Sequence, residues 1–196
     1  MRKLILPMLA TLALASPALA VPITYGAVLI GANEVPAVNT PGFGNALVTL
    51  DLEAHTMAVS ASFQDLIGFT SASHIHCCQP NGTNAGVATQ TPSFVGFPLG
   101  VQSGVFANVY NTSLASTWNP AFITANGGSV AQAEAVFFAG VAAGMAYYNI
   151  HTAAPLGFPG GEIRGQLAPV PEPATLALLG LGLSGVAAMR RRSKRS

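Results

Sequence analysis

Ser73-His74-Ile75-His76-Cys77-Cys78 is the stretch of sequence around which the rest of the chain is organised. Side chains alternate between the two faces of an extended strand, so we expect His74 and His76 on one face and Ile75 on the core face. Imidazole and thiolate groups both suit copper and zinc, and four of these six residues carry one of them. The stretch therefore predicts a strand that presents metal-ligand side chains.

A second stretch of the same kind is Tyr148-Asn149-Ile150-His151-Thr152, in which a histidine again follows an isoleucine. The chain has four histidines, and three of them lie in these two places. His74, His76 and His151 are candidate ligands for one copper or zinc ion, with water completing the coordination. The alternative is that the three rings hydrogen-bond to loop backbone and order a loop over the sheet.

The only cysteines of the chain, Cys77 and Cys78, are adjacent. An exported protein enters an oxidising compartment, which favours a vicinal disulfide between them as a rigid clip at the strand end. An intermolecular bridge and thiolate ligation of a metal are the alternatives. Strand alternation places only Cys78 on the histidine face, which opposes a site that uses both thiolates.

The N-terminus has the pattern of a secretory signal. Basic Arg2 and Lys3 precede a mostly apolar run, and Ala18-Leu19-Ala20 matches an A-x-A cleavage site. We therefore expect residues 1–20 to be a signal peptide that is removed after Ala20. An uncleaved membrane helix is the weaker alternative, because the apolar run is short and contains prolines.

The C-terminus, residues 170–196, has the pattern of a second targeting signal. Val170-Pro171-Glu172-Pro173 is followed by an uncharged, mostly apolar run over 174–189 and then by a cluster rich in arginine. A helix over 174–189 would span about 24 Å, slightly less than the ~30 Å hydrocarbon core of a bilayer. Such a helix predicts transient anchoring in the inner membrane with the arginines on the cytoplasmic side.

The body between these ends, residues 21–169, carries little charge. It contains one basic residue, Arg164, and six acidic residues, which give a net charge of −5. One arginine cannot neutralise a run of phosphates, so nucleic-acid binding is excluded. The length suits a single domain with its own core.

The pattern of the body predicts a mainly β fold with a short helical insertion, specifically a Greek-key-like antiparallel sandwich or barrel. Asn119-Pro120 predicts a helix start, and Ser129 with Gln132 predicts a second helix over 130–139, ended by the glycines at 140 and 144. The strands are predicted at 23–30, 45–52, 57–63, 70–76, 105–110, 145–151 and 162–167.

The connections of the body carry further predictions. His55 lies in the turn between the second and third strands, where we expect a solvated side chain. The loop over 79–100 is long enough to indicate a functional or covering element. For Arg164 we expect a salt bridge with Glu162, Glu34 or Asp65 that organises the last strand, and the alternative is that it guides an anion.

Known catalytic signatures are absent from the sequence. It contains no nucleophile elbow, zinc-protease motif, phosphate loop or dinucleotide fingerprint. No catalytic residue is assigned, and a non-enzymatic role is favoured.

Several of these motifs, in this order, resemble the CHRD domain, first recognised in chordin and widespread in exported bacterial proteins. The resemblance covers roughly residues 23–168, and its motifs are Glu34-Val35-Pro36, Ser73-His74-Ile75-His76, Tyr148-Asn149-Ile150-His151-Thr152 and Gly160-Gly161-Glu162-Ile163-Arg164-Gly165. The C-terminal tail is similar to the PEP-CTERM sorting signal. That similarity implies handling by the export machinery and by an exosortase-type enzyme, cleavage near the motif, and delivery to the cell envelope, surface or extracellular matrix, where envelope proteins or exopolysaccharide are possible partners.

The layout of the histidines is also similar to that of copper–zinc superoxide dismutases. The similarity implies copper ligation by His74, His76 and His151 and anion guidance by Arg164. The 79–100 loop contains no histidine, so the bridging and zinc ligands of those enzymes are missing.

Three hypotheses for function follow. The first is a non-enzymatic surface or matrix protein that acts by binding or by structure. The second is a copper-dependent redox protein that uses the three histidines. The third is a metal-free module that binds protein or glycan through exposed aromatic rings, for which the candidates are Tyr110, Trp118, Tyr147 and Tyr148.

Overall fold

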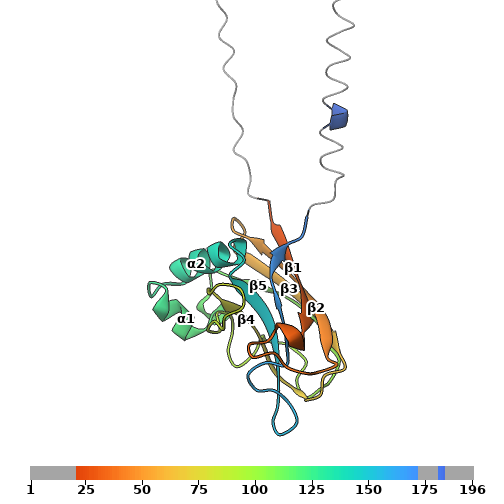
Figure 1. The fold of residues 1–196 in the computed structure, drawn as a ribbon. Helices are drawn as coiled ribbons and strands as arrows, with labels where there is room; N and C mark the ends of the chain where they lie inside the picture. The colour runs from red at the N-terminus through yellow and green to blue at the C-terminus, as the bar shows by residue number, and fades with distance from the viewer. Residues whose placement is uncertain (1–20, 172–180, 184–196) are drawn as a thin grey trace, which may run out of the picture.

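The computed structural model describes residues 21–171 and 181–183 (Figure 1). The predicted signal peptide, Glu172 and Pro173 of the sorting signal, and most of the predicted span 174–189 lie outside these residues. Within the described residues no helix has both the length and the apolar character needed to cross a membrane.

One curled antiparallel sheet forms the body, and it confirms the predicted mainly β fold. The strand order is β4-β6-β7-β1-β2-β3-β5, with β8 paired to β1. The strands are β1 (Ile23–Ile30), β2 (Phe43–Asp51), β3 (Thr56–Gln64), β4 (Thr70–Cys77), β5 (Gly104–Asn111), β6 (Ala146–Thr152), β7 (Ile163–Gln166) and β8 (Ala168–Pro169). Strands β1, β2 and β3 follow one another as hairpins, whereas β4 lies at the opposite edge from β5.

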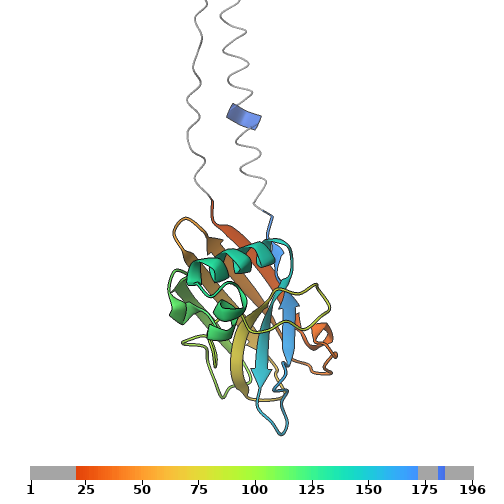
Figure 2. The same ribbon diagram turned by 90° about the vertical axis from the view of Figure 1, so that its left-hand side faces the viewer.

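Helical segments occupy the connections. They are the 3-10 turns η1 (Gly31–Asn33) and η2 (Ala115–Thr117) and the helices α1 (Pro120–Ala125) and α2 (Val130–Ala142). Both α-helices lie on one side of the sheet, as the two perpendicular views show (Figures 1 and 2). Asn119 caps α1 through a bond from the Ala121 N–H, and Ser129 caps α2 through a bond from the Gln132 N–H, as the sequence predicted.

Helix α2 continues three residues beyond its predicted end at 139. Gly140 lies inside the helix and does not end it. Glycine is needed at this position to make room for the two cysteine sulfurs, because a Cβ would lie 2.4 Å from Cys77 Sγ and 2.5 Å from Cys78 Sγ. Gly144, at φ +69°, follows the helix end.

The core lies between the inner face of the sheet and the helices with the long loop. Strand alternation supplies its floor, because inward residues such as Val48, Val59 and Ile75 are buried while their neighbours on β2 and β3 are exposed. Phe137 of α2 and Phe94 of the long loop cover that floor.

The four aromatic residues named as possible exposed platforms are all buried. Tyr110, Trp118, Tyr147 and Tyr148 expose 6% or less of their surface. Trp118 stacks near Phe122 and donates its ring N–H to the Thr112 carbonyl, so it belongs to the core. None of the four rings is available as an exposed binding platform.

Candidate metal centre

Antiparallel pairing of β4 with β6 brings the three histidines together. Residues that pair directly present their side chains on the same face, and here Ala72 pairs with His151, His74 with Asn149 and His76 with Tyr147. His74, His76 and His151 therefore lie on the outer face, opposite the helices. They are buried because loops cover this half of the face.

Each histidine ring has one nitrogen fixed by a backbone carbonyl. His74 Nε2 lies 2.7 Å from the Pro92 oxygen, His76 Nδ1 2.8 Å from the Ala85 oxygen, and His151 Nδ1 2.9 Å from the Pro159 oxygen. A carbonyl oxygen only accepts, so each of these nitrogens carries the proton. The lone pairs are then on His74 Nδ1, His76 Nε2 and His151 Nε2.

Those three unprotonated nitrogens face one another. His76 Nε2 and His151 Nε2 are 3.4 Å apart, and His74 Nδ1 is buried without a hydrogen-bond partner. One ligand atom from each of the three rings can be chosen such that all lie within 4.8 Å of one another. Nitrogen ligands at ~2.0–2.1 Å from a tetrahedral zinc ion are about 3.4 Å apart, so a small movement of His74 would complete the set.

Burial keeps the three rings neutral. Burial, together with the neighbouring imidazoles, lowers the pKa of His74 and of His76 to about 4. Burial also lowers the pKa of His151. The rings therefore present lone pairs at neutral pH, which is the form that binds metal.

These residues fit a transition-metal ion. Metal-ligating histidines commonly donate the second ring N–H to a carbonyl, which fixes the tautomer and the ring orientation. All three rings have that arrangement here. Three convergent nitrogens suit copper or zinc and would leave one position open for a fourth ligand.

A cation–π stack flanks the histidines. The Tyr147 ring lies parallel to the His76 ring, with centroids 4.8 Å apart, and the Arg164 guanidinium lies 4.0 Å from the Tyr147 centroid. Arg164 also donates to Asn84 Oδ1 at 2.9 Å and to the Thr83 carbonyl at 3.3 Å. Arg164 thus fixes the loop segment that supplies the carbonyl to His76.

The expected ion pair between Arg164 and Glu162 does not form. Glu162 is fully buried and instead accepts four hydrogen bonds, from the hydroxyls of Thr40 and Thr152 and from the N–H groups of Ile67 and Gly68. Within the described residues, the one ion pair is His55–Glu134. Glu162 joins three loops through neutral donors and needs no cation.

Glu34 lies close to Arg164 and Asn149. Burial raises its pKa to about 7, although Arg164 and Asn149 both favour the charged form. Its Oε1 and the Oδ1 of Asn149 are buried without hydrogen-bond partners. A Cβ at Gly161 would lie 2.6 Å from Glu34 Oε1, so glycine is required where these groups meet. Three of the quoted sequence motifs meet in this neighbourhood, those that contain Glu34, Asn149 and Gly161.

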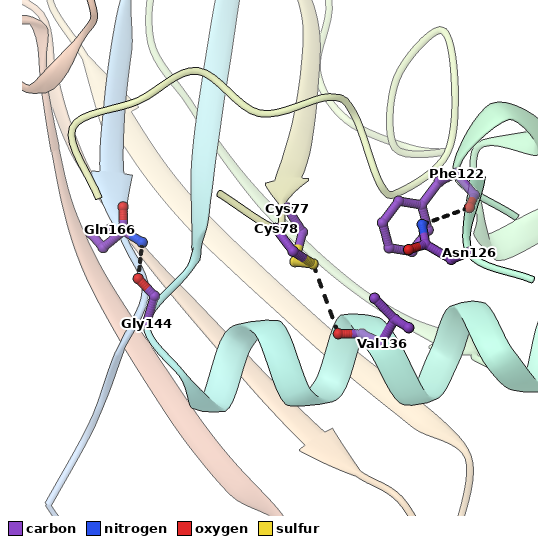
Figure 3. Close-up of a disulfide and its surroundings, with 7 residues drawn as sticks. All are labelled: Cys77, Cys78, Phe122, Asn126, Val136, Gly144 and Gln166. Carbon is purple, nitrogen blue, oxygen red and sulfur yellow. Dashed lines mark hydrogen bonds between the residues drawn. A yellow bond between two sulfur atoms is a disulfide. The ribbon is translucent and has the colours of Figure 1, made fainter. Parts of the chain in front are cut away.

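Cys77 and Cys78 form a disulfide at the end of β4, directly above α2 (Figure 3). The Cys78 sulfur also lies 3.8 Å from the Val136 carbonyl. Cys77 points toward the core, on the side opposite His76, so the disulfide contacts the helix rather than the histidine cluster.

His55 was expected to be a solvated turn residue, and this is only half correct. Its side chain is 51% exposed, but Nδ1 lies 2.9 Å from the buried Glu134 carboxylate of α2. The Thr112 hydroxyl donates to the same carboxylate. The fourth histidine therefore links the β2–β3 turn to the helix and lies outside the cluster of His74, His76 and His151.

Comparisons with known protein families gave two matches. The model of the CHRD domain matches residues 25–167, and that of the PEP-CTERM protein-sorting motif matches residues 169–192. No curated protein and no solved structure matches the chain. The sorting motif shows that the chain is an exported protein directed to the cell envelope or surface by exosortase-type machinery. Since the first match covers more than half of the sequence, the chain belongs to the CHRD domain family.

Proposed function

We propose that this exported protein binds one copper or zinc ion through His74 Nδ1, His76 Nε2 and His151 Nε2, and that the ion serves a structural role at the cell surface. The observation that carries the proposal is the convergence of three unprotonated nitrogens, each on a ring whose other nitrogen donates to a backbone carbonyl. Without a cation, two of these nitrogens would face each other at 3.4 Å with no hydrogen between them.

A structural role is supported by what the three rings hold. The carbonyls of Pro92 and Ala85 belong to the long loop, and that of Pro159 belongs to the β6–β7 connection. A metal ion on the rings would therefore join both loops to the sheet. Each histidine is less than a tenth exposed, which restricts access to the ion and favours retention over turnover.

The rest of the cluster orients these ligands. Arg164 fixes Thr83 and Asn84, next to the carbonyl that His76 uses, and Tyr147 packs against the His76 ring. A bound metal would supply positive charge to the nitrogen lone pairs, and with copper it would also supply a one-electron couple.

Copper-dependent redox activity is the second candidate. Arg164 lies on the same outer face as the histidines, as an anion-guiding residue would. Arg164 as a whole is only 3% exposed, and its guanidinium already donates to Asn84 and Thr83, which favours the structural role.

The proposal extends to processing. The signal peptide would occupy residues 1–20, the CHRD domain 21–169 and the sorting tail 170–196. The tail would anchor the chain briefly in the inner membrane, and cleavage near the Val170–Pro173 motif would release it. Exopolysaccharide and envelope proteins are the partners that such a destination offers.

The decisive experiment is elemental analysis of the chain after export, purified without a histidine tag. We expect close to one equivalent of copper or zinc, lost when His74, His76 and His151 are changed together to alanine. His55→Ala is the matched control, because His55 lies outside the cluster, and it should retain the metal. No metal after loading with Cu²⁺ and Zn²⁺, or equal loss in the control, would overturn the proposal. Superoxide and other redox assays on the loaded protein decide between the two candidates.

A further inference from the structure

The outer face of β1, β2, β3 and β5 has a composition unlike that of the histidine half. The strand registers align its outward side chains in rows across the sheet. These rows are Ile30–Phe43–Gln64, Val28–Asn45–Ser62–Val105, Gly26–Leu47–Ser60–Ala107 and Thr24–Thr49–Ala58–Val109. The next row, Asp51–Thr56–Asn111, carries one carboxylate at the end of the hairpin. The four rows before it contain no charged residue, and most of their large side chains are aliphatic or aromatic. We call this set of rows the neutral face.

The apolar side chains of the neutral face are solvent-exposed. Val105 is 80% exposed, Val109 65% and Val28 63%. Both helices lie on the opposite side of the sheet (Figure 1), so they do not cover it. An exposed apolar area of several residues on one face marks an interaction surface.

The surface of the neutral face has a shallow groove with ridges beside it. Small side chains on β3, Ala58 and Ser60, form the floor of a hollow of about 480 Å³. Leu47 and Val109 border it. A groove and a ridge that lie side by side on one surface become complementary when a two-fold axis applies the surface to itself.

The distribution of charge is compatible with a second copy of the chain as the partner. Four of the seven charged residues of 21–169 are buried, namely Glu34, Glu134, Glu162 and Arg164. The remaining charges, Asp51, Glu53 and Asp65, lie at the two ends of the β2–β3 hairpin, away from its middle. Nothing within the neutral face repels a second copy of the chain, and it presents no charge that would select an ionic partner. Surfaces with so few charges favour self-association.

We propose that the neutral face is a homodimer interface, in which two copies pack face to face about a two-fold axis. The aliphatic ridge of each copy lies in the β3 groove of the other, and the two sheets form a sandwich with the usual spacing of about 10 Å. The metal centres lie on the other half of each sheet. The dimer therefore does not depend on the metal.

Sedimentation velocity of the full exported chain over a wide concentration range tests this. We expect a monomer–dimer equilibrium that shifts to monomer by more than tenfold in Kd for the double variant Leu47→Lys, Val109→Lys. The control is Leu99→Lys, Leu156→Lys, which adds the same charge at two exposed loop leucines and should dimerise like the parent. The apolar tail is identical in all variants, so association through the tail would not distinguish them.

A milder pair, Val105→Thr with Val109→Thr, keeps β-branched side chains and should weaken the dimer with the fold intact, as circular dichroism can verify. A parent chain that stays monomeric at all concentrations overturns the proposal. A dimer that survives both variant pairs overturns the assignment to this face. A monomer that binds a neutral polysaccharide through the same residues would assign the face to glycan instead of to a second copy.

Discussion

The two halves of the outer face of this sheet share the same β backbone but differ in the side chains they carry and in their exposure to solvent. On β4, β6 and β7 the face carries histidines, Arg164 and Asn149, all buried beneath loops. On β1, β2, β3 and β5 it is open to solvent and carries a single charge, that of Asp51 at the end of β2. One sheet can do both because three connections converge on the first half: the long loop after β4, the β6–β7 connection, and the β1–β2 connection with Glu34 and Val35.

The difference shows what the loops contribute. A polar side chain on a covered strand needs a partner, since an unpaired buried group costs about 1–3 kcal/mol. In the covered half, carbonyls of the loops meet that need for each histidine. In the open half, solvent water can hydrogen-bond to polar side chains. Single substitutions there should therefore change the stability of the monomer very little.

The largest contrast is expected for Glu162→Gln against Leu47→Ser. The amide at 162 would turn a donor toward groups that already donate, so the free energy of unfolding should fall by about 3 kcal/mol. Leu47→Ser in the open half should change it by about 0.5 kcal/mol or less. Urea unfolding of both variants measures this, and similar losses would show that the two halves do not differ as described.

The next largest difference in stability is expected between two glycine substitutions, Gly161→Ala and Gly86→Ala. Gly161 has φ +130°, and its Cβ would lie 2.6 Å from Glu34 Oε1, whereas Gly86 has open space around it. We expect a loss of about 2 kcal/mol for Gly161→Ala and almost none for Gly86→Ala. Thermal unfolding reports both, and equal Tm values would contradict the close packing around Gly161.

Acid should destabilise the covered half of the metal-free protein. The pKa values of the three histidines are lowered by folding, so unfolded chains bind more protons as the pH falls from 6.5 toward 4. The contribution of the neutral rings to the free energy of unfolding is fully present above pH 6.5. It falls as the pH drops toward 4, by up to about 1.4 kcal/mol per pH unit for each ring.

Glu34 acts in the opposite direction, because its raised pKa gives stability that is present below about pH 4.5 and lost as the pH rises through about 7. Urea unfolding at pH 7 and pH 5.5 should show a net loss in acid, and Glu34→Gln should make it larger. The triple histidine-to-alanine variant should lack the loss, and an unchanged pH profile would show that the rings are not buried in the neutral form.

The smallest effect is expected for Arg164→Lys. Lysine keeps the charge but lacks the planar group that reaches Asn84 and Thr83 while lying on Tyr147. Because Arg164 acts indirectly, through the loop and the Tyr147 ring that orient His76, metal affinity should fall by about tenfold. Competition with a chelator measures this, and Asn45→Ser, a change at an exposed position of β2, is the control. Unaltered affinity would show that the loop is held without Arg164.

Much of the fold could be predicted from local patterns. The alternation of apolar residues located β2 and β3, and Asn119-Pro120 and Ser129 located the starts of both helices, because these signals depend on near neighbours. Gly140 was misinterpreted as a helix stop, since its role depends on the cysteine sulfurs of a distant strand. The predicted salt bridge of Arg164 was likewise wrong. Its actual contacts, with Tyr147, Thr83 and Asn84, depend on pairing between segments far apart in the sequence.

The sequence by itself determined the strands, the face that His74 and His76 share, and the address patterns at both ends, because strand period and local composition carry that information. Only the tertiary structure decided that His151 joins them, through the β4–β6 register, and that loop carbonyls select which nitrogen of each ring is free. It also decided which half of the outer face is covered. Contacts between residues far apart in the chain set these features, and no local pattern encodes them.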